Sequence, residues 1–405
     1  MIRLLAVGND PTIALPAREV QGDTHQRQLR YASILEHYHL ITRAPPSGSV
    51  PARLQLAHNF WVSPCRSRGM AGYLVEAVRT GWRIVREENI QAVSTQDPFI
   101  TGLAGYLIAR RYGLPLSLQF VADAVDNPLW LAEKPYYRAL NLLAHWLIRR
   151  AITFRVVSAA EKQKLVHFGV PEQRIWNLPS LSDFGRFLQG NGQAVRNKYL
   201  REEGSLAAGK HTGKRLVLLV ARLVPQKDVP MLLRAFAGLG EEYSSATLLI
   251  VGSGPLEQEL KRYTVTLGLA DRVIFAGAVA YDQLPAYYAA CDVLVLSSLY
   301  EGNARVLAEA AASARPVVST AVSGAVDTIV DGKTGYIVPI GDSAAMAGRL
   351  RGLLGDRARA MSMGEKARAH ILDLYSPDRL LAGFSELWET TAACGKKAQG
   401  QGLCQ

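Results

Sequence analysis

The sequence predicts an α/β fold built from two Rossmann-like, doubly wound domains that face each other. Short runs rich in Leu, Ile and Val alternate with helical patterns along nearly the whole chain, which is typical of parallel sheets. A stretch rich in Gly, Asn, Gln and charged residues interrupts this alternation at 185–213. The chain has 405 residues, of which 49% are hydrophobic, and this is enough for two cores.

The first domain is expected to span 1–184. Its strands are short apolar runs with many branched residues, expected at 4–7, 38–42, 92–95, 116–120 and 154–157. Stretches with helical periodicity lie between them, at 25–36, 72–88, 100–112 and 136–150.

A linker is expected at 185–213 and the second domain at 214–374. The alternation is clearer in this half, with strands expected at 215–221, 247–251, 273–275, 293–297, 316–320 and 335–338. A last helix, within 375–393, stands apart from that rhythm. The tail 394–405 is rich in Gly, Lys and Gln, which predicts disorder.

The net charge of +11 favours an acidic partner, which can be nucleic acid, an anionic membrane surface or a phosphorylated ligand. No run of five or more like charges and no zinc-finger or RNA-binding signature is found. We therefore expect no nucleic-acid partner.

The four cysteines are scattered without CxxC spacing, which suits a reducing compartment and predicts no metal site. The apolar run at the start is too short for a signal peptide. No window reaches the ~18 apolar residues of a membrane span. The expected location is cytoplasmic, at most peripheral at the inner face of a membrane.

Two carboxylates, Glu301 and Glu309, lie eight positions apart around a predicted helix start. Glu301 follows the apolar run 293–297, and Asn303 is expected to be the N-cap of the helix that carries Glu309. Helical side chains lean toward the N-terminus. Both carboxylates are therefore expected at one opening, together with an anion site formed by the helix N–H groups. A surface loop carboxylate and an ordinary helical ion pair are the alternative.

Arg222 and Lys227 follow the first strand of the second domain within one loop. Two cations at that place can hold a diphosphate, Arg through paired hydrogen bonds and Lys as a point charge. If the diphosphate leaves, they stabilise the charge that develops. The alternative is a pair of solvated loop cations.

A glycine turn, Val251-Gly252-Ser253-Gly254-Pro255, ends a strand and begins a helix. Gly252 and Gly254 let the backbone approach a ligand, although an ordinary strand-to-helix turn uses the same residues. It is no dinucleotide fingerprint, because GxGxxG is absent.

In the first domain, polar residues follow several predicted strands. Gly22 with Asp23 precedes a helix and can contact phosphate or acceptor, while an N-cap is an equal alternative. Asp97 and Asp123 are available to a ligand hydroxyl, or are turn residues. The histidines show no pair at metal-ligand spacing in the sequence and are interpreted as structural.

Aromatic and basic residues mix at helical spacing between Trp130 and Arg150. Such a mixture suits the lipid headgroup zone. Packing of the aromatic face into the domain is the favoured alternative.

Taken together, these motifs resemble the retaining glycosyltransferases of glycosyltransferase family 4, which have the GT-B architecture. The likeness is carried by 221–227, 251–255, 284–296, the Glu301–Glu309 segment, 316–320 and 331–338. It is specific over 215–354 and looser but continuous over the first domain.

The resemblance implies a nucleotide-sugar donor, with UDP or GDP as nucleotide, bound mostly by the second domain, and no metal or other cofactor. Glu309 would accept hydrogen bonds from the ribose, Arg222 and Lys227 would hold the diphosphate, and Glu301 would contact the sugar. Backbone support would come from Gly302, Asn303, Ala304, Arg305 and Val306. The last helix would cross back onto the first, acceptor-side domain.

The sequence departs from the family at Val121, where many relatives have His. Either Asp123 or Asp97 would then cover the role of that His, or the family His aligns a few residues away, or the activity is weakened. The expected function is transfer to a glycan or lipid-linked acceptor in surface polysaccharide or glycolipid biosynthesis. An anionic membrane surface is a further expected partner. A nucleotide-sugar epimerase of the same fold and a non-catalytic scaffold for glycan assembly are the alternatives.

Overall fold

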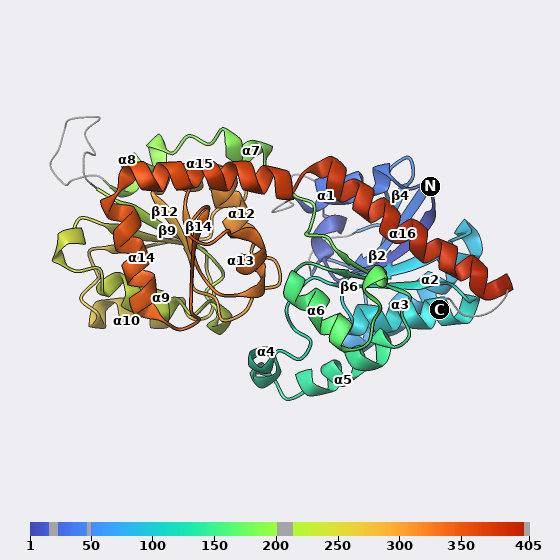
Figure 1. Cartoon of the computed structure of the whole chain (residues 1–405). Helices are drawn as coiled ribbons and strands as arrows, with labels where there is room; N and C mark the ends of the chain where they lie inside the picture. The colour runs from blue at the N-terminus through green and yellow to red at the C-terminus, as the bar shows by residue number, and fades with distance from the viewer. Residues whose placement is uncertain (16–22, 47–49, 201–213, 401–405) are drawn as a thin grey trace. The chain divides into compact units, whose positions relative to one another are not determined.

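The computed structural model describes residues 1–15, 23–46, 50–200 and 214–400. The chain forms two compact units, unit 1 with Met1–Ser182 and Tyr375–Gln405, and unit 2 with Asp183–Leu374. Each unit is a mostly parallel sheet with helices on its faces (Figure 1). The expected fold class, two Rossmann-like α/β domains, is confirmed.

Unit 1 contains an eight-stranded sheet in the order β3-β4-β2-β1-β5-β6-β7-β8. All neighbours are parallel except β3 and β4, which are antiparallel. The five predicted strands are confirmed, whereas β3, β4 and β8 were not predicted. The strands are β1 (Arg3–Val7), β2 (His37–Arg43), β3 (Leu54–Ala57), β4 (Phe60–Cys65), β5 (Ala92–Thr95), β6 (Leu116–Phe120), β7 (Thr153–Val156) and β8 (Ile175–Asn177).

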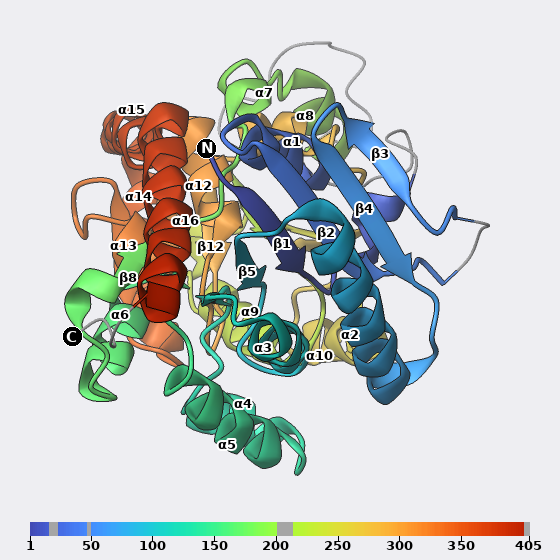
Figure 2. The ribbon, with the colours of Figure 1, turned by 90° about the vertical axis from the view of Figure 1, so that its right-hand side faces the viewer.

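The helices of unit 1 cover both faces of this sheet, with α1 and α16 on one face and α2 and α3 on the other (Figure 2). Tyr31 of α1 packs against Phe384 and Trp388 of α16. The helices are η1 (Pro11–Ala14), α1 (Thr24–Ser33), α2 (Gly69–Glu88), α3 (Ile100–Tyr112), α4 (Pro128–Glu133), α5 (Tyr137–Ile148), α6 (Ala159–His167), η3 (Glu172–Arg174) and α16 (Pro377–Gly400).

The last helix, α16, packs on unit 1, as the crossing back to the first domain requires. Thr391 of α16 hydrogen-bonds Thr153 of β7 between hydroxyl oxygens 2.6 Å apart. The helix continues to Gly400, so residues 394–400, expected in a disordered tail, are helical instead.

Unit 2 contains a six-stranded sheet in the order β11-β10-β9-β12-β13-β14, parallel throughout. Its strands are β9 (Leu216–Val220), β10 (Thr247–Val251), β11 (Val273–Gly277), β12 (Val293–Leu296), β13 (Val317–Thr320) and β14 (Gly335–Val338). All six were predicted. They are apolar runs because both faces of the sheet are covered, and the four residues of β12 are fully buried.

The helices of unit 2 alternate with these strands. They are α7 (Gly185–Leu188), α8 (Gln193–Tyr199), η4 (Pro225–Lys227), α9 (Val229–Ala237), η5 (Glu241–Tyr243), α10 (Glu257–Thr266), α11 (Leu284–Ala290), α12 (Arg305–Ala312), α13 (Ser323–Thr328), α14 (Ser343–Gly355) and α15 (Arg357–Leu374). Asp side chains begin two of them, since Asp228 accepts from Met231 N and Asp342 from Ala345 N.

Two of these short helices, α7 and α8, lie in the range expected to be a linker. Phe187 is 1% exposed, and its carbonyl accepts a hydrogen bond from Ser313 of unit 2. Arg196 donates to the carbonyl of Ala290 at 2.6 Å. Residues 185–199 therefore belong to unit 2 through a few buried anchors that composition does not reveal, and 201–213 lie outside the described residues.

No helix in the described part of the chain combines the length and apolar character that crossing a membrane requires.

Candidate functional site

The loop after β9 carries Arg222 and Lys227. Arg222 is exposed, and within the described ranges its guanidinium makes no hydrogen bond or ion pair, although its carbonyl accepts from Val224 N at 3.0 Å. The Lys227 side chain is 15% exposed and donates from Nζ to Oε1 of Glu301. Its backbone carbonyl accepts from Ser297 Oγ at 2.7 Å, which ties this loop to the end of β12.

Glu301 lies in the loop after β12, at the neighbouring strand of the same sheet. Its Oε1 accepts from Lys227 and from Ser298 Oγ at 2.9 Å. Its carbonyl accepts from Ser323 Oγ at 2.7 Å and from Gly324 N at 3.0 Å. The structure thus brings Lys227 and Glu301 into direct contact, whereas a separate role was expected for each. Ser298 and Ser323 were missed because hydroxyls near strand ends carry no distinctive pattern.

The glycine turn after β10 packs against the loop that follows β9. Gly252 has φ 130, and a Cβ on it would lie 1.9 Å from the carbonyl oxygen of Ala221. A Cβ on Gly254 would lie 2.4 Å from the carbonyl oxygen of Leu223. The two loops are also joined by a hydrogen bond from Leu223 N to Ser253 O at 3.0 Å. Both glycines are therefore needed for contact between the loops, whether or not a ligand also approaches them.

The expected N-cap of the helix that carries Glu309 is wrong. α12 begins at Arg305, its N-cap position is Ala304, and no side chain caps it. The Asn303 carbonyl instead accepts from Arg305 N at 3.0 Å in a tight turn. This turn lies against Gly324, where a Cβ would be 2.7 Å from Ala304 N. Without a side-chain acceptor, the positive end of α12 favours an anionic ligand.

Around this helix start, Gly302 and Ala304 are buried, while Asn303, Arg305 and Val306 are half-buried. The Arg305 guanidinium donates to the hydroxyl of Tyr281 at 2.9 Å and lies 3.6 Å from Oε1 of Glu309. Arg305 is thus held by neighbours on its own unit.

Glu309 is only 3% exposed, so it is more deeply buried than expected for a carboxylate at an opening. Its Oε2 accepts from Tyr288 OH at 2.6 Å, and its Oε1 accepts from Tyr281 OH at 3.2 Å. Burial, together with the charge of Glu309, raises the pKa of Tyr288 well above its ordinary value. Both tyrosines were missed, because they come from the segment around α11 and only the fold brings them to α12.

In unit 1, the Asp97 side chain accepts backbone hydrogen bonds at the start of α3. Its Oδ1 accepts from Phe99 N at 2.8 Å and from Thr101 N at 3.3 Å. Burial raises the pKa of the Asp97 carboxyl above its ordinary value, although these hydrogen bonds oppose the shift. This geometry supports the turn-residue alternative. Gly22 lies outside the described residues.

Asp123 forms an ion pair with Lys164 of α6, with Nζ 2.5 Å from Oδ1. Val121, which was expected at the position where many relatives have His, is 40% exposed. Glu161 lies one turn before Lys164 and was missed. It is 2% exposed, and neither of its carboxylate oxygens has a hydrogen-bond partner within the described residues. Burial raises the pKa of Glu161 to about 8, against the opposing charge of Lys164.

One group in the described part of the chain brings three side chains of metal-ligand type together, namely His37, His39 and Glu88. Both imidazoles contact the same carboxylate oxygen, at 2.6 and 2.7 Å. Arg53 pairs with the other oxygen at 2.8 Å. The histidines alternate on β2 and so share a face. Glu88 Oε1 has this ion pair but no hydrogen bond in the described part of the chain. The two histidines themselves are held by protein partners, which agrees with a structural role for them.

Two family models match the chain. One, described as glycosyl transferases group 1, matches residues 201–370, and the other, a glycosyl transferase 4-like domain, matches 28–179. The chain is 33% identical over 345 residues to the GDP-mannose-dependent alpha-(1-6)-phosphatidylinositol monomannoside mannosyltransferase of Mycolicibacterium smegmatis, covering 78% of this chain and 86% of that protein. It is 29% identical to the D-inositol 3-phosphate glycosyltransferase of Nocardia farcinica, covering 72% and 66%.

Solved structures share the fold at low sequence identity. Sucrose-phosphate synthase from Thermosynechococcus elongatus has a TM-score of 0.79 at 19% identity, covering 96% of this chain and 99% of that chain. Anabaena HepE in complex with UDP and glucose has a TM-score of 0.74 at 17% identity, covering 96% and 100%.

Proposed function

The chain belongs to glycosyltransferase family 4 and is a nucleotide-sugar-dependent glycosyltransferase of glycan or glycolipid biosynthesis, and we propose that unit 2 binds the donor through the cluster around Lys227 and Glu301. One observation carries this proposal. A cation and a carboxylate from neighbouring strand ends meet beside a helix start that no side chain caps. Ligands of parallel α/β sheets bind at such strand ends.

The donor diphosphate is held by Lys227, Arg222 and the start of α12. A diphosphate attracts the Lys227 ammonium away from Glu301, since it offers several anionic oxygens. Glu301 is then released from its internal partner and accepts hydrogen bonds from hydroxyls of the sugar. Donor binding and the placing of Glu301 are coupled in this way.

Glu309 accepts hydrogen bonds from the ribose hydroxyls of the donor. The hydroxyls of Tyr288 and Tyr281 donate to this carboxylate, and Arg305 lies beside it. These neighbours orient the carboxylate, and we expect the ribose hydroxyls to bind to it in that orientation.

The bond between the anomeric carbon and the β-phosphate oxygen breaks through an oxocarbenium-like state. The negative charge that develops on the leaving diphosphate is stabilised by Arg222, Lys227 and the α12 dipole. The acceptor hydroxyl attacks from the leaving-group side, and its proton passes to the departing phosphate oxygen. The configuration at the anomeric carbon is retained.

We propose GDP-mannose as the donor, because the mannosyltransferase that is 33% identical to this chain is named for that donor. The same name supports a lipid-linked acceptor. A lipid-linked acceptor in turn favours action at the inner face of a membrane.

Exposed side chains on α4, on α5 and at the N-cap position of α5 are available to such a surface. Leu129 is 43% exposed, Tyr136 55% and Leu142 70%. Trp146 instead packs edge-on against Tyr106, with ring centroids 4.8 Å apart, which supports the packing alternative for that part of the stretch. Sedimentation with anionic liposomes at low salt tests the contact, and equal sedimentation with neutral liposomes argues against it.

The first test is thermal unfolding of the protein with GDP, UDP, ADP and CDP. A nucleotide at ~100 times its dissociation constant stabilises the fold by roughly 2.7 kcal/mol. We expect GDP to raise the unfolding temperature most, and Glu309→Ala to lose this rise. Glu259→Ala, which alters an exposed carboxylate of α10, is expected to keep the same rise as the wild type. No shift with any nucleotide contradicts the proposed site.

The second test is product analysis with GDP-mannose, with and without a lipid acceptor. A glycosyltransferase adds one hexose to the acceptor, whereas an epimerase converts the donor in its absence. Turnover of either kind excludes the scaffold.

A further inference from the structure

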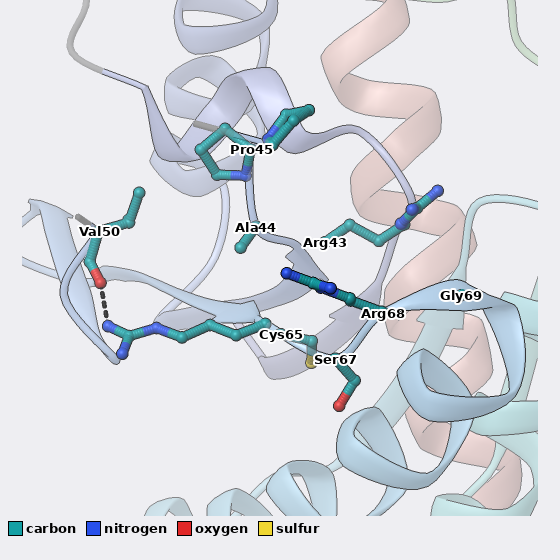
Figure 3. Close-up of a pocket in the computed structure, with 10 residues that line it drawn as sticks. Arg43, Ala44, Pro45, Val50, Cys65, Ser67, Arg68 and Gly69 are labelled. Atoms are coloured by element: carbon teal, nitrogen blue, oxygen red, sulfur yellow. Dashed lines mark hydrogen bonds between the residues drawn. The ribbon is translucent and has the colours of Figure 1, made fainter. Parts of the chain in front are cut away.

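A second charged site lies in unit 1, separate from the residues considered above. A cavity of about 470 Å³ opens there, lined by Arg43, Ala44, Pro45, Pro46, Val50, Cys65, Arg66, Ser67, Arg68 and Gly69 (Figure 3). Arg43 ends β2 and Cys65 ends β4, which are neighbouring parallel strands. The cavity, here called the arginine pocket, thus lies at the carboxyl ends of strands, where parallel α/β sheets bind ligands.

The charge of the arginine pocket is not balanced by its own walls. None of the described residues that line it is acidic. The guanidinium groups of Arg43 and Arg68 make no hydrogen bond or ion pair with any described residue. Arg66 donates to the carbonyl of Val50, the bond drawn as a dashed line in Figure 3. The Glu76 carboxylate of α2 interacts with the charge of Arg66, so it is mainly Arg43 and Arg68 that make the pocket favour an anion.

The loop that carries Arg66 and Arg68 is held in place by Glu76 of α2. Its Oε1 accepts from Arg66 N at 3.1 Å, and its Oε2 accepts from Ser67 N at 2.7 Å and from the Ser67 hydroxyl. The carboxylate is thus used to fix the backbone of the loop. A fixed loop lowers the entropy cost of binding a ligand.

The start of α2 adds to the positive potential. This helix has 20 residues, its N-cap position is Arg68, no side chain caps it, and its first turn holds no acidic residue. Gly69 has φ 72, which lets the chain turn from the loop into the helix. The positive end of the helix dipole is therefore at the same wall as Arg68.

We propose that the arginine pocket binds a phosphate group of the acceptor, so that the acceptor is a phosphorylated sugar or polyol, free or as a lipid headgroup. This inference rests on the proposed transferase function. Guanidinium groups match phosphate oxygens in pairs. Donors that come from a strand end, a loop and a helix start suit a tetrahedral group better than a planar carboxylate. The cavity exceeds a phosphate alone, which leaves room for the carbon part.

The test is calorimetric titration with glycerol 3-phosphate, with glycerol as the uncharged control. GDP is kept at saturation, so that phosphate binding at the donor site of unit 2 is excluded. We expect the wild type to bind glycerol 3-phosphate and not glycerol. Arg43→Gln and Arg68→Gln are each expected to weaken this binding about tenfold. Arg79→Gln changes an exposed arginine of the same helix and is expected to bind like the wild type.

The double variant Arg43→Lys, Arg68→Lys keeps the charge. It is the control that separates a loss of phosphate binding from a folding defect. It is expected to recover part of the affinity lost in the double Gln variant, because Lys supplies charge without the paired donors. Wild-type affinity in the double Gln variant, or equal binding of glycerol 3-phosphate and glycerol by the wild type, overturns the proposal.

Two further measurements assign the source of the phosphate and separate the two hypotheses. Sedimentation with phosphatidylcholine vesicles, with and without phosphatidylinositol, is compared between the wild type and the double Gln variant. Loss of phosphatidylinositol-dependent binding in that variant indicates a lipid headgroup, and binding of glycerol 3-phosphate alone indicates a free phosphorylated acceptor. If GDP stabilises the wild type but glycerol 3-phosphate does not bind, only the proposal for the arginine pocket is overturned. If GDP does not stabilise the wild type, the proposed function is overturned.

Discussion

The arginine pocket of unit 1 and the Lys227–Glu301 cluster of unit 2 both lie at the carboxyl ends of parallel strands, but their charges are balanced in different ways. In unit 2, Lys227 pairs with Glu301, and Glu309 is held by Arg305 and two tyrosines. In the arginine pocket, the guanidinium groups of Arg43 and Arg68 have no hydrogen-bond or ion-pair partner among the described residues.

This difference indicates two kinds of site. A cluster with internal counter-ions is stable when empty, and a ligand must exchange partners to bind. A pocket with unbalanced charge depends on the ligand for its counter-ion, so its affinity falls steeply with salt. The first arrangement suits a residue that must change its contacts during a reaction. The second suits a group that only holds a substrate.

The largest effect is expected for Glu301→Gln, which tests whether the paired carboxylate takes part in the reaction. The amide keeps the size of the side chain but removes the charge that stabilises an oxocarbenium-like state. We expect kcat to fall about 100-fold or more, with GDP stabilisation retained. Steady-state kinetics measure the first and thermal unfolding the second. Unchanged turnover would show that Glu301 has no catalytic role.

Lys227→Ala tests the role of the cation in the Lys227–Glu301 cluster, both in donor binding and in the stability of the empty protein. The loss of a charged hydrogen bond to the diphosphate is expected to weaken GDP binding about tenfold. The variant is also expected to be less stable when empty, because Glu301 is left half-buried without its cation. A double-mutant cycle with Glu301→Ala measures the coupling between them. Additive effects on stability would mean that the pair contributes nothing to the empty state.

Tyr288→Phe tests the support of Glu309. The hydroxyl is fully buried and donates at 2.6 Å to the carboxylate. Its loss is expected to lower the free energy of unfolding by about 1–2 kcal/mol and to reduce the GDP shift. Urea unfolding measures the stability. Tyr243→Phe, which removes a hydroxyl that bonds the carbonyl of Arg351 far along the chain, is the control. An equal loss of the GDP shift in both variants would contradict a specific role for Tyr288.

Glu161 provides the most gradual effect, spread over several pH units. It tests a buried carboxylate of unit 1 that has an ion pair with Lys164 but accepts no hydrogen bond among the described residues. Burial raises the pKa of Glu161 from its ordinary value of 4.5 to about 8. The folded state therefore keeps a proton that the unfolded state loses. The stability that this proton provides is fully present below pH 4.5 and is lost as the pH rises through about 8.

The free energy of unfolding is therefore expected to change with pH by at most about 1.4 kcal/mol per pH unit. Glu161→Gln, which is always neutral, is expected to remove this change, as urea unfolding between about pH 5 and pH 8 would show. Parallel stability curves for the wild type and the variant would mean that Glu161 is ionised in the folded protein at neutral pH.

The fold was predictable for most strands that are buried on both faces, whereas β4 is buried but was missed, because Ser63 and Pro64 interrupt its apolar run. Most of the buried strands, β12 among them, are continuous apolar runs that the sequence shows directly. β3 was missed because it lies at the sheet edge, where its residues are exposed or half-buried and follow no apolar pattern. β8, at the other edge, has three residues, too few for a period to appear. α7 and α8 were missed because a few anchors such as Phe187 hold them.

The sequence by itself determined the family, the α/β architecture and the residues of unit 2 that stand near strand ends, because these features depend on residues close together in the chain. Only the tertiary structure decided which of them meet. Lys227 and Glu301 are 74 positions apart, and Glu309 is buried by tyrosines of another segment.

The arginine pocket is the clearest example of a feature that only the tertiary structure decided. Arg43 and Arg68 belong to separate segments of the sequence and carry no shared motif. They line one cavity because β2 and β4 are neighbours in the sheet. Strand order is fixed by packing over the whole unit, so a site shared by two strand ends is created by the fold and not by any local pattern.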